Sequence, residues 1–419
     1  MKKIYIIFLA FCLPHLLNAQ EFVYLTTGAS YNEQVYYRLS DDSNIHIAND
    51  EWDIAFTFVG DSTGIFVNES VRTSFGNPQN PVVALDAGDA TWSSTINPDD
   101  LTTRLYNDEK SWAWGAFNSM RNADDPNDYG WGVYSEENAG VFSDKVFVVQ
   151  LRDGSYKKLQ IQNLVDGVYT VRYADLDGSN ENNLTIEPEL AGQSHIVCLS
   201  LSTGDFVSEL VDLSWDMVFQ RYVTDIMDTP FSVSGVLTDY GVQVAEARDI
   251  SPEDATYDVY QDLLESDIDV IGHDWKEFNN GWIIQDQLSY FVLTEGPRLW
   301  KIQFYEFQGS STGGITFEKT DLTDLVNTQS PLSDLQDIAI SPNPASESVD
   351  IVFSIKNKPE GKLTISIMDI RGRTLKYYHP DVHLGLNAFR LNDLPKEKGI
   401  YFISLQSAGH KITRKLVVE

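Results

Sequence analysis

The chain contains two copies of one pattern of apolar and aromatic blocks, and a repeat of this kind constrains the fold of both copies together. Trp52-Asp53-Ile54-Ala55-Phe56 recurs as Trp215-Asp216-Met217-Val218-Phe219. Trp114-Gly115-Ala116-Phe117-Asn118 recurs as Trp275-Lys276-Glu277-Phe278-Asn279, so the two tryptophans stand 62 residues apart (52 to 114) in the first copy and 60 (215 to 275) in the second. Three further blocks match in the same order: Gly130-Trp131 with Gly281-Trp282, 145–149 with 289–293, and 158–161 with 301–304.

The residues within each copy predict antiparallel β structure with one short helix. The Trp-Asp blocks are short apolar runs rich in β formers, typical of buried strands. Asn97-Pro98-Asp99-Asp100 and Ser251-Pro252-Glu253-Asp254 each combine a cap residue, a proline and acidic residues, which indicates a helix start, and the second helix should run to about Glu265. We therefore expect two tandem domains, at residues 20–190 and 191–322, in a mostly β protein.

The copies differ in length at one place. Asn118 and Gly130 are 12 positions apart, whereas Asn279 and Gly281 are 2 apart. The extra residues, 119–129, are polar and include a proline, which predicts a surface loop. Aromatic residues that both copies share are expected to build the scaffold. Trp112 and Tyr129 occur only in the first copy, so they are the better candidates for stacking on a ligand.

Residues 337–419 form a separate β unit in the sequence. Alternating apolar residues predict strands at 349–355, 363–368, 388–391, 400–405 and 411–418, which together suggest a β-sandwich. The polar stretch 323–336 is expected to be a linker.

The N-terminus predicts export. Lys2 and Lys3 precede an apolar run that ends near Ala19, so residues 1–19 are expected to be a signal peptide. No later stretch is long enough to span a bilayer. Only Cys198 remains after cleavage, so an internal disulfide is not available and the core must hold the fold.

Charge narrows the range of partners. The whole chain carries −32 and residues 336–419 carry +3, which leaves −35 for residues 1–335. Such a charge repels nucleic acids and anionic lipids and keeps a protein in solution. It also allows cation binding. Asp175, Asp177 and Glu181 have the oxygen density of a calcium loop, but the glycine and glutamate positions of an EF-hand are not met, and a turn that closes the domain is the alternative.

Four motifs in the C-terminal unit resemble the sorting domain of proteins exported by the Bacteroidetes type IX secretion system. They are Pro342-Asn343-Pro344, the 367–373 block with Gly372, Gly399-Ile400-Tyr401-Phe402, and the terminal block that begins at Lys415. The resemblance implies recognition by that machinery in the periplasm and a final location on the outer-membrane surface or outside the cell.

The repeated unit resembles the HmuY-like family, through Tyr36-Tyr37-Arg38-Leu39, the Trp52 strand and the Val146–Val149 hairpin. The resemblance implies heme or another porphyrin as ligand, held by axial side chains that are commonly histidines. His195 and His273 are the candidates, because they fall in the same predicted domain, although no motif assigns them and both would also suit ordinary surface positions.

These features predict a secreted binding protein and no enzyme, because the sequence contains no catalytic motif. Two alternatives remain open at this point. One is a surface adhesion or interaction protein that uses the same scaffold for a glycan or a cell surface. The other is a glycan-active enzyme, since acidic residues are abundant.

Overall fold

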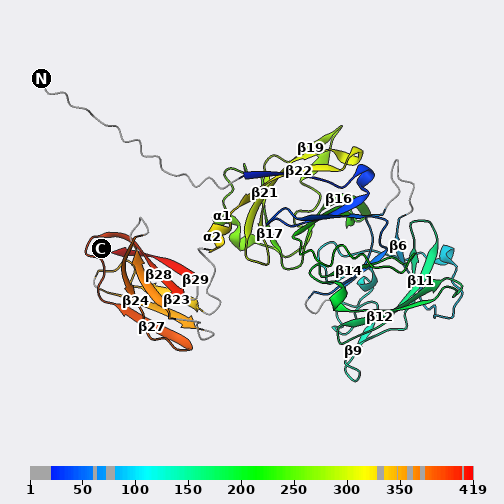
Figure 1. The fold of residues 1–419 in the computed structure, drawn as a ribbon, viewed down its shortest axis with the longest axis horizontal. Helices are drawn as coiled ribbons and strands as arrows, with labels where there is room; N and C mark the ends of the chain where they lie inside the picture. Colours follow the sequence, from blue (N-terminus) through cyan, green and yellow to red (C-terminus); the bar gives the residue numbers. More distant parts are fainter. Residues whose placement is uncertain are drawn as a thin grey trace. The chain divides into compact units, whose positions relative to one another are not determined.

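The computed structural model describes residues 20–59, 64–71, 81–327, 335–346, 348–355, 362–368, 373–407 and 410–418. The described chain is mostly antiparallel β structure, as predicted (Figure 1). It divides into two compact units, a body and a C-terminal unit that contains residues 321–419 together with 297–299. The predicted signal peptide lies outside the described residues. Within them, no helix has the length and apolar character needed to cross a membrane.

The body has two lobes, each with its own hydrophobic core. The first lobe is built on core residues between Ile54 and Leu201. The second lobe is built on two separate stretches, from Val23 to Leu39 and from Met217 to Phe317. The predicted division at residue 190 therefore does not separate the packing units, because the start of the chain packs with its second half.

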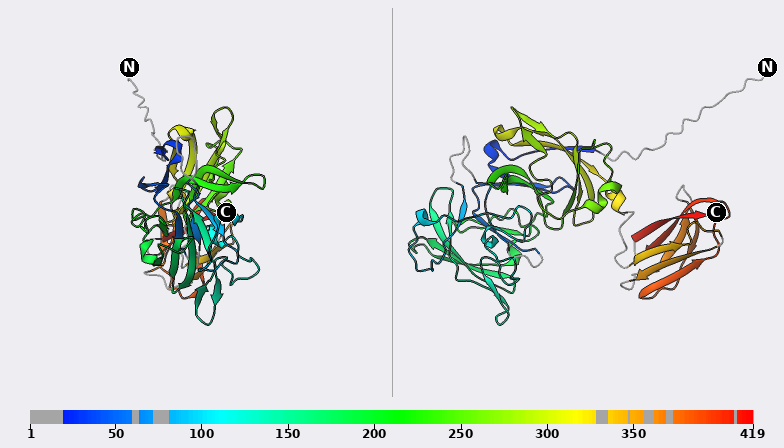
Figure 2. Two further views of the ribbon diagram at one scale, coloured as in Figure 1. Left: turned by 90° about the vertical axis from the view of Figure 1, so that its right-hand side faces the viewer. Right: turned by 180° about the vertical axis from the view of Figure 1, so that it is seen from behind.

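Corresponding sheets form the centre of each lobe (Figure 2). The first lobe has the order β13 (Asn182–Ile186), β12 (Val168–Asp175), β11 (Tyr156–Val165), β10 (Phe147–Gln150), β6 (Val83–Asp86) and β7 (Arg104–Leu105), with β8 (Val133–Ser135) and β9 (Gly140–Phe142) attached. The second has the order β1 (Gln20–Thr26), β22 (Gly314–Asp321), β21 (Leu299–Phe307), β20 (Leu288–Leu293) and β17 (Gln243–Arg248). At the same edge of the two sheets, β13 pairs with β12 and β1 pairs with β22. Since β1 is the first strand of the first copy, β13 is its equivalent and the second copy begins at Asn182.

The remaining body sheets join strands from both copies. One has the order β16 (Pro230–Thr238), β15 (Met217–Asp225), β2 (Glu33–Tyr37) and β3 (Asn44–Ala48); the other has the order β14 (Ile196–Leu199), β4 (Ile54–Thr57) and β5 (Ile65–Val67). A hairpin, β18 (Lys276–Phe278) and β19 (Trp282–Ile284), completes the second lobe. The opening strands of each copy thus pair with the Trp-Asp strand of the other, which is a reciprocal exchange within one chain.

The aspartate of each Trp-Asp block closes this exchange. The Asp53 backbone N–H donates to the Leu199 carbonyl at 2.9 Å, and its carboxylate accepts the Leu201 N–H at 2.8 Å. In the other copy, the Asp216 N–H donates to the Tyr37 carbonyl at 2.9 Å and its carboxylate accepts the Leu39 N–H at 2.7 Å. The same pair of hydrogen bonds therefore occurs twice: Asp53 of the first copy binds the end of β14 from the second copy, and Asp216 of the second copy binds the end of β2 from the first.

Helical structure is shorter than the sequence suggests. The described helices are α1 (Tyr257–Tyr260) and α2 (Thr323–Asn327), with the single-turn 3-10 helices η1 (Ala29–Tyr31), η2 (Pro98–Asp100), η3 (Ala116–Asn118), η4 (Pro188–Leu190), η5 (Gln261–Leu263) and η6 (Gly309–Ser311). Asn97 caps η2 as predicted, and its side chain accepts the Asp99 N–H. The helix expected from Ser251 begins only at Tyr257, because Lys301 Nζ binds the carbonyls of Pro252 and Ala255 and holds that segment as a turn.

The C-terminal unit contains two sheets on one core. Their orders are β23 (Leu335–Ser341), β24 (Val349–Ile355), β27 (Gly385–Leu391), and β26 (Thr374–Tyr378), β25 (Thr364–Met368), β28 (Gly399–Ser407), β29 (His410–Val418). Alternate residues of β24 are buried, as its sequence pattern predicts. Two strands were not expected: β23, which begins inside the predicted 323–336 linker, and β26. The helix α2 occupies the start of that linker.

We predict that Asp53→Ala destabilises the body by about 3 kcal/mol, because Asp53 is fully buried and its loss leaves both the Leu201 N–H and the Arg152 guanidinium, 3.1 Å away, without this acceptor. Urea unfolding of residues 20–419, followed by tryptophan fluorescence, measures the effect. Asp89→Ala, at an exposed carboxylate, is the control. Equal urea midpoints for Asp53→Ala and Asp89→Ala would contradict the proposed role of the Asp53 carboxylate in holding the exchanged strands.

Candidate functional site

A third core lies between the two lobes, and we call it the seam core. Its buried members come from both copies: Tyr36, Ile47, Trp52, Ala55, Val59, Phe66, Trp112, Ile196, Cys198, Val207, Leu210, Leu213, Trp215, Val218, Tyr222, Val233, Leu237 and Ile268. It contains a cavity of about 40 Å³, within a hollow of about 560 Å³ when open solvent is included. The cavity volume corresponds to roughly two or three water molecules.

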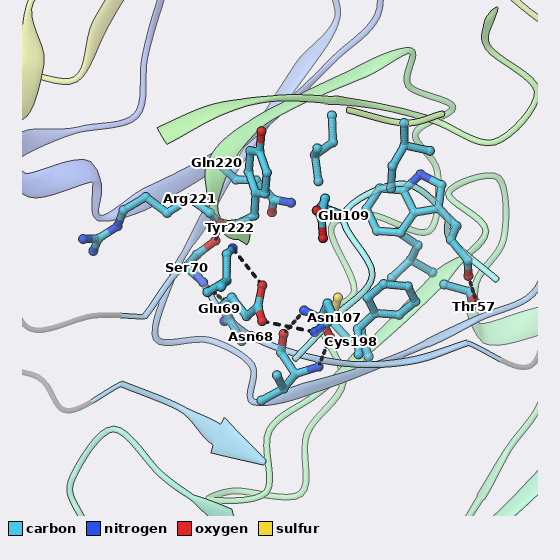
Figure 3. A pocket seen from close by; sticks show the side chains of 18 of the residues that line it. Thr57, Asn68, Glu69, Ser70, Asn107, Glu109, Cys198, Gln220, Arg221 and Tyr222 are labelled. Carbon is cyan, nitrogen blue, oxygen red and sulfur yellow. Dashed lines mark hydrogen bonds between the residues drawn. The ribbon is translucent and has the colours of Figure 1, made fainter. Parts of the chain in front are cut away.

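Aromatic side chains and carboxylates line this seam cavity (Figure 3). The aromatic members are Tyr36, Trp52, Phe66, Trp112 and Tyr222. The Glu69 carboxylate is buried and accepts the backbone N–H groups of Asn107, at 3.2 Å, and Val223, at 2.9 Å. It therefore bonds one residue from each copy. Glu109 also lines the cavity and is partly exposed.

The two repeated tryptophans differ in their hydrogen bonds. The indole Nε1–H of Trp215 donates to the Ser194 carbonyl at 3.2 Å. The indole nitrogen of Trp52 is buried and has no hydrogen-bond partner in the structure. Trp52 lines the seam cavity and is 6% exposed. The unpaired N–H is buried within the seam core, where such a group costs about 1–3 kcal/mol.

His195 lies beside a buried carboxylate. Its Nδ1 is 3.8 Å from Oδ2 of Asp239, an electrostatic contact that is longer than a hydrogen bond. The polar interaction with Asp239 raises the pKa of His195, and burial partly offsets this increase. Burial raises the pKa of Asp239 to about 6, while His195 acts in the opposite direction. The pair is thus a titratable group at the edge of the seam.

His273 has different neighbours. Its ring packs edge-on against Tyr222, with centroids 6.5 Å apart. Burial and the nearby Lys276 lower the pKa of His273. Among the contacts of the described residues, none joins His273 to His195, so the structure does not bring the two predicted heme ligands together by direct contact.

Trp112 has a structural position that the sequence did not reveal. It packs against Phe66 and Trp215, and its indole N–H donates to the Thr238 carbonyl at 2.8 Å. Its ring therefore joins the copies and is not an exposed stacking surface. Tyr129, in contrast, packs partly against the first-lobe core, and the two do not share a site.

The insertion 119–129 is an exposed loop, as predicted. The Asp128 carboxylate accepts the N–H groups of Asn122 and Gly130, both at 2.8 Å, so the loop is closed on itself. Beside it lies an open groove of about 380 Å³, which Val133, Phe142 and Lys145 help to line. This groove belongs to the first lobe alone.

The predicted calcium ligands are already engaged. Asp175 is 2.6 Å from Lys157 Nζ, and Asp177 accepts the N–H and the hydroxyl of Ser179. Glu181 accepts the indole N–H of Trp92 at 3.1 Å. In the described parts of the chain no group of three or more His, Cys, Asp or Glu side chains is placed to hold a metal ion. Calcium binding there remains a prediction that would require displacing Lys157.

Two of the four C-terminal motifs meet in space. The Asn343 side chain, between Pro342 and Pro344, accepts the Val417 N–H at 2.8 Å, next to Lys415 in β29. The Tyr401 hydroxyl donates to the Glu397 carbonyl at 2.8 Å, beside Gly399 at the start of β28. Gly372 lies outside the described residues. The motifs therefore fix the last strand of the unit.

Several notable residues were missed by the sequence reasoning, namely Trp52, Glu69, Glu109 and Lys276. Lys276 is 6% exposed, and its Nζ lies 4.1 Å from the Trp275 ring centroid. Burial lowers the pKa of Lys276 to about 7. The local sequence carries no signal for Trp52, Glu69 and Glu109, because their surroundings arise from the exchange between copies, whereas the neighbours of Lys276 all belong to the second copy.

The Asp239–His195 pair predicts a pH dependence. Both groups have a raised pKa in the folded state, so their stabilisation is complete below the unfolded pKa and is lost as the pH rises through the folded pKa. We expect Asp239→Asn to lose stability relative to the wild type by roughly 2 kcal/mol more at pH 4.5 than at pH 7.5. Urea unfolding at a series of pH values tests this, and parallel curves for the two proteins would contradict it.

The Asn343 contact predicts a role in export. Asn343→Ala should cost about 1 kcal/mol, because the Val417 N–H loses an acceptor. In a domain of this size such a loss lowers the Tm by about 4–8 °C. Calorimetry of the purified chain and the exported fraction in cells are the two measurements. Unchanged melting would show that the motif does not position β29.

Comparison with known proteins identifies two segments. A family described as HmuY protein matches residues 30–175, and a family described as secretion system C-terminal sorting domain matches residues 339–419. A second HmuY match is not found, so the second copy rests on the internal repeat. No curated protein matches the chain.

Two solved structures show weak similarity. Dimeric latent PorU from Porphyromonas gingivalis has 10% identity, a TM-score of 0.17, and alignment over 92% of this chain and 34% of its own, so this chain spans about a third of that protein. A structure titled for Dscam isoform specificity has 12% identity, a TM-score of 0.14, and coverage of 96% and 100%. These scores define no shared overall fold.

Neither matched family is catalytic, and the sorting domain directs export by the type IX secretion system to the cell surface or the extracellular space. The chain therefore joins a domain of the HmuY family, at residues 30–175, to a type IX secretion sorting domain at residues 339–419.

Proposed function

We propose that the exported protein is a non-enzymatic binding protein whose ligand is heme or another porphyrin. The HmuY match over residues 30–175 carries this proposal. The protein reaches the cell surface or the medium, where a binding protein can meet such a ligand.

The surroundings of His195 support it as one axial ligand. Histidines that bind metals commonly have a carboxylate on the second ring nitrogen, which fixes the ring and raises its basicity. The Asp239 carboxylate lies on the Nδ1 side of His195, 3.8 Å away, and a small approach would bring it into this role and leave Nε2 for iron. His195 is about one third exposed, so a ligand can approach it. His273 is the other histidine of the second copy and is the proposed partner.

A surface glycan is the second candidate ligand, favoured by the groove beside the insertion. The groove is large enough for a sugar, and Phe142 offers it a partly exposed ring. The Asp89 and Asp144 side chains line the groove, and in the described part of the chain neither has a hydrogen-bond or ion-pair partner. Both carboxylates are therefore available to accept sugar hydroxyl groups.

Heme titration of the mature chain, residues 20–419, tests the first proposal. We expect a saturable, red-shifted Soret band, with affinity reduced at least tenfold in His195→Ala. His46→Ala is the matched control, because His46 also lies beside a carboxylate, with Nδ1 2.7 Å from Glu33, but on an edge strand.

The outcomes separate the candidates. If His195→Ala and His46→Ala bind heme with equal affinity, His195 is not an axial ligand. A wild-type chain without a Soret band would reject heme. Binding to a glycan array that is lost on deleting residues 119–128, with unchanged melting, would then support the groove.

A further inference from the structure

The strand β1 forms an open edge of the second-lobe sheet. It lies beside β22 at the start of the order β1-β22-β21-β20-β17 and, within the described chain, pairs with no other strand (Figure 1). An edge strand presents a row of unpaired N–H and C=O groups, which can pair with a strand of another molecule. β1 has 7 residues, no proline and one charged side chain, so it lacks the features that usually block such pairing.

The open backbone groups of β1 are those of alternate residues. The Thr27 N–H donates to the Gly313 carbonyl at 3.1 Å, which continues the β1–β22 ladder with a hydrogen-bonded pair. In an antiparallel ladder such pairs alternate with non-hydrogen-bonded pairs. Val23 therefore bonds its partner in β22, whereas Phe22 and Tyr24 turn their N–H and C=O groups toward the open edge. A strand that lies along this edge can satisfy both residues.

The same two residues carry exposed aromatic side chains. Phe22 is 62% exposed and Tyr24 is 55% exposed. The Phe22 ring packs edge-on against the exposed Tyr305 ring of β21, with centroids 5.2 Å apart. The outer face of the sheet is therefore apolar at the edge where the backbone is open, and both features would be covered by one neighbouring strand.

The first lobe shows that the scaffold does not need these aromatic residues. Each edge strand turns two alternate residues toward its core, namely Val23 and Leu25 in β1 and Leu184 and Ile186 in β13. Phe22 and Tyr24 of β1 therefore correspond to Asn183 and Thr185 of β13, which are exposed and polar. Of the two equivalent edges, only that of β1 combines an open backbone with exposed aromatic side chains.

We infer that β1 pairs with β1 of a second molecule of this chain, antiparallel and with the two Val23 residues on the two-fold axis. In this register Phe22 forms a hydrogen-bonded pair with Tyr24 of the partner subunit, so the open residues of both strands are used. Their rings stand opposite each other on the outer face, a cross-strand contact that stabilises sheets. The strand is thus complementary to itself, as a two-fold interface requires.

Charge favours the antiparallel arrangement. Glu21 is the one charged residue of β1, and its carboxylate lies 3.5 Å from Lys319 Nζ. Antiparallel pairing places Glu21 opposite Leu25 of the partner subunit, whereas parallel pairing in register would place two Glu21 side chains next to each other. The acidic bodies repel each other at low ionic strength. Salt screens this repulsion, so it should strengthen the dimer, whereas it would weaken one held by ion pairs.

Sedimentation equilibrium of residues 20–419 over a series of concentrations, at low and at physiological salt, tests this inference. We expect a monomer–dimer equilibrium that tightens as sodium chloride is added. Tyr24→Lys should weaken the dimer by about tenfold or more, because it replaces a ring and places two positive charges diagonally across the axis. Thr185→Lys, at the equivalent exposed position of β13, is the matched control and should associate as the wild type does.

Oxidative cross-linking of single-cysteine substitutions tests the register. Val23→Cys brings two thiols together at the axis and should give a covalent dimer. Tyr24→Cys should cross-link more slowly, because the residue opposite it is Phe22 of the partner subunit. The natural Cys198 is buried, so it contributes little background.

A wild-type chain that stays monomeric at every concentration, or equal association of Tyr24→Lys and Thr185→Lys, would overturn the pairing of β1. Faster cross-linking of Tyr24→Cys than of Val23→Cys would overturn the register. A monomeric wild type whose binding to a glycan array is lost in Tyr24→Lys would assign this face to a sugar and overturn the dimer.

Discussion

Two aspartates hold the body together, because each fastens the segment that one copy lends to the other. Asp53 and Asp216 each donate a backbone N–H to the borrowed strand and accept a backbone N–H just beyond it. A strand that only pairs by its backbone could slide or separate, whereas a carboxylate bonded past its end fixes the register. The first role of the repeated Trp-Asp block is thus to bind the strand that comes from the other copy.

This joint has consequences for what counts as a domain. The HmuY match begins at residue 30 and includes β2 and β3, yet β2 pairs with β15 in the second lobe, and among the described strands β3 pairs only with β2. The matched segment is therefore not a packing unit by itself. Glu69 shows the same dependence, since its carboxylate bonds Asn107 of one copy and Val223 of the other. The seam core and its cavity follow from the exchange.

Sequence reasoning predicted what depends on local pattern. Strand β24 has the bounds expected from its alternating residues, and the hairpin expected at Val146–Val149 connects β10 to β11. Exchange leaves no local signal, because β2 has the same pattern whether it pairs within its copy or across to β15. Trp112 is an example, because no feature of the sequence indicated that this residue, found in one copy alone, packs on Trp215 of the other.

Differences between the copies carry more functional information than their similarities. Asp53 and Asp216 serve the fold alike, so neither points to a ligand. Trp52 and Trp215 share a sequence block, yet one indole N–H is bonded to Ser194 and the other is left unpaired. In a duplicated fold, each residue can be compared with the equivalent residue of the other copy. An unfavourable feature that only one copy has is not needed to form the fold. Of the unequal positions, the insertion is the one that borders an open groove, and it is there that selection for binding would leave its mark.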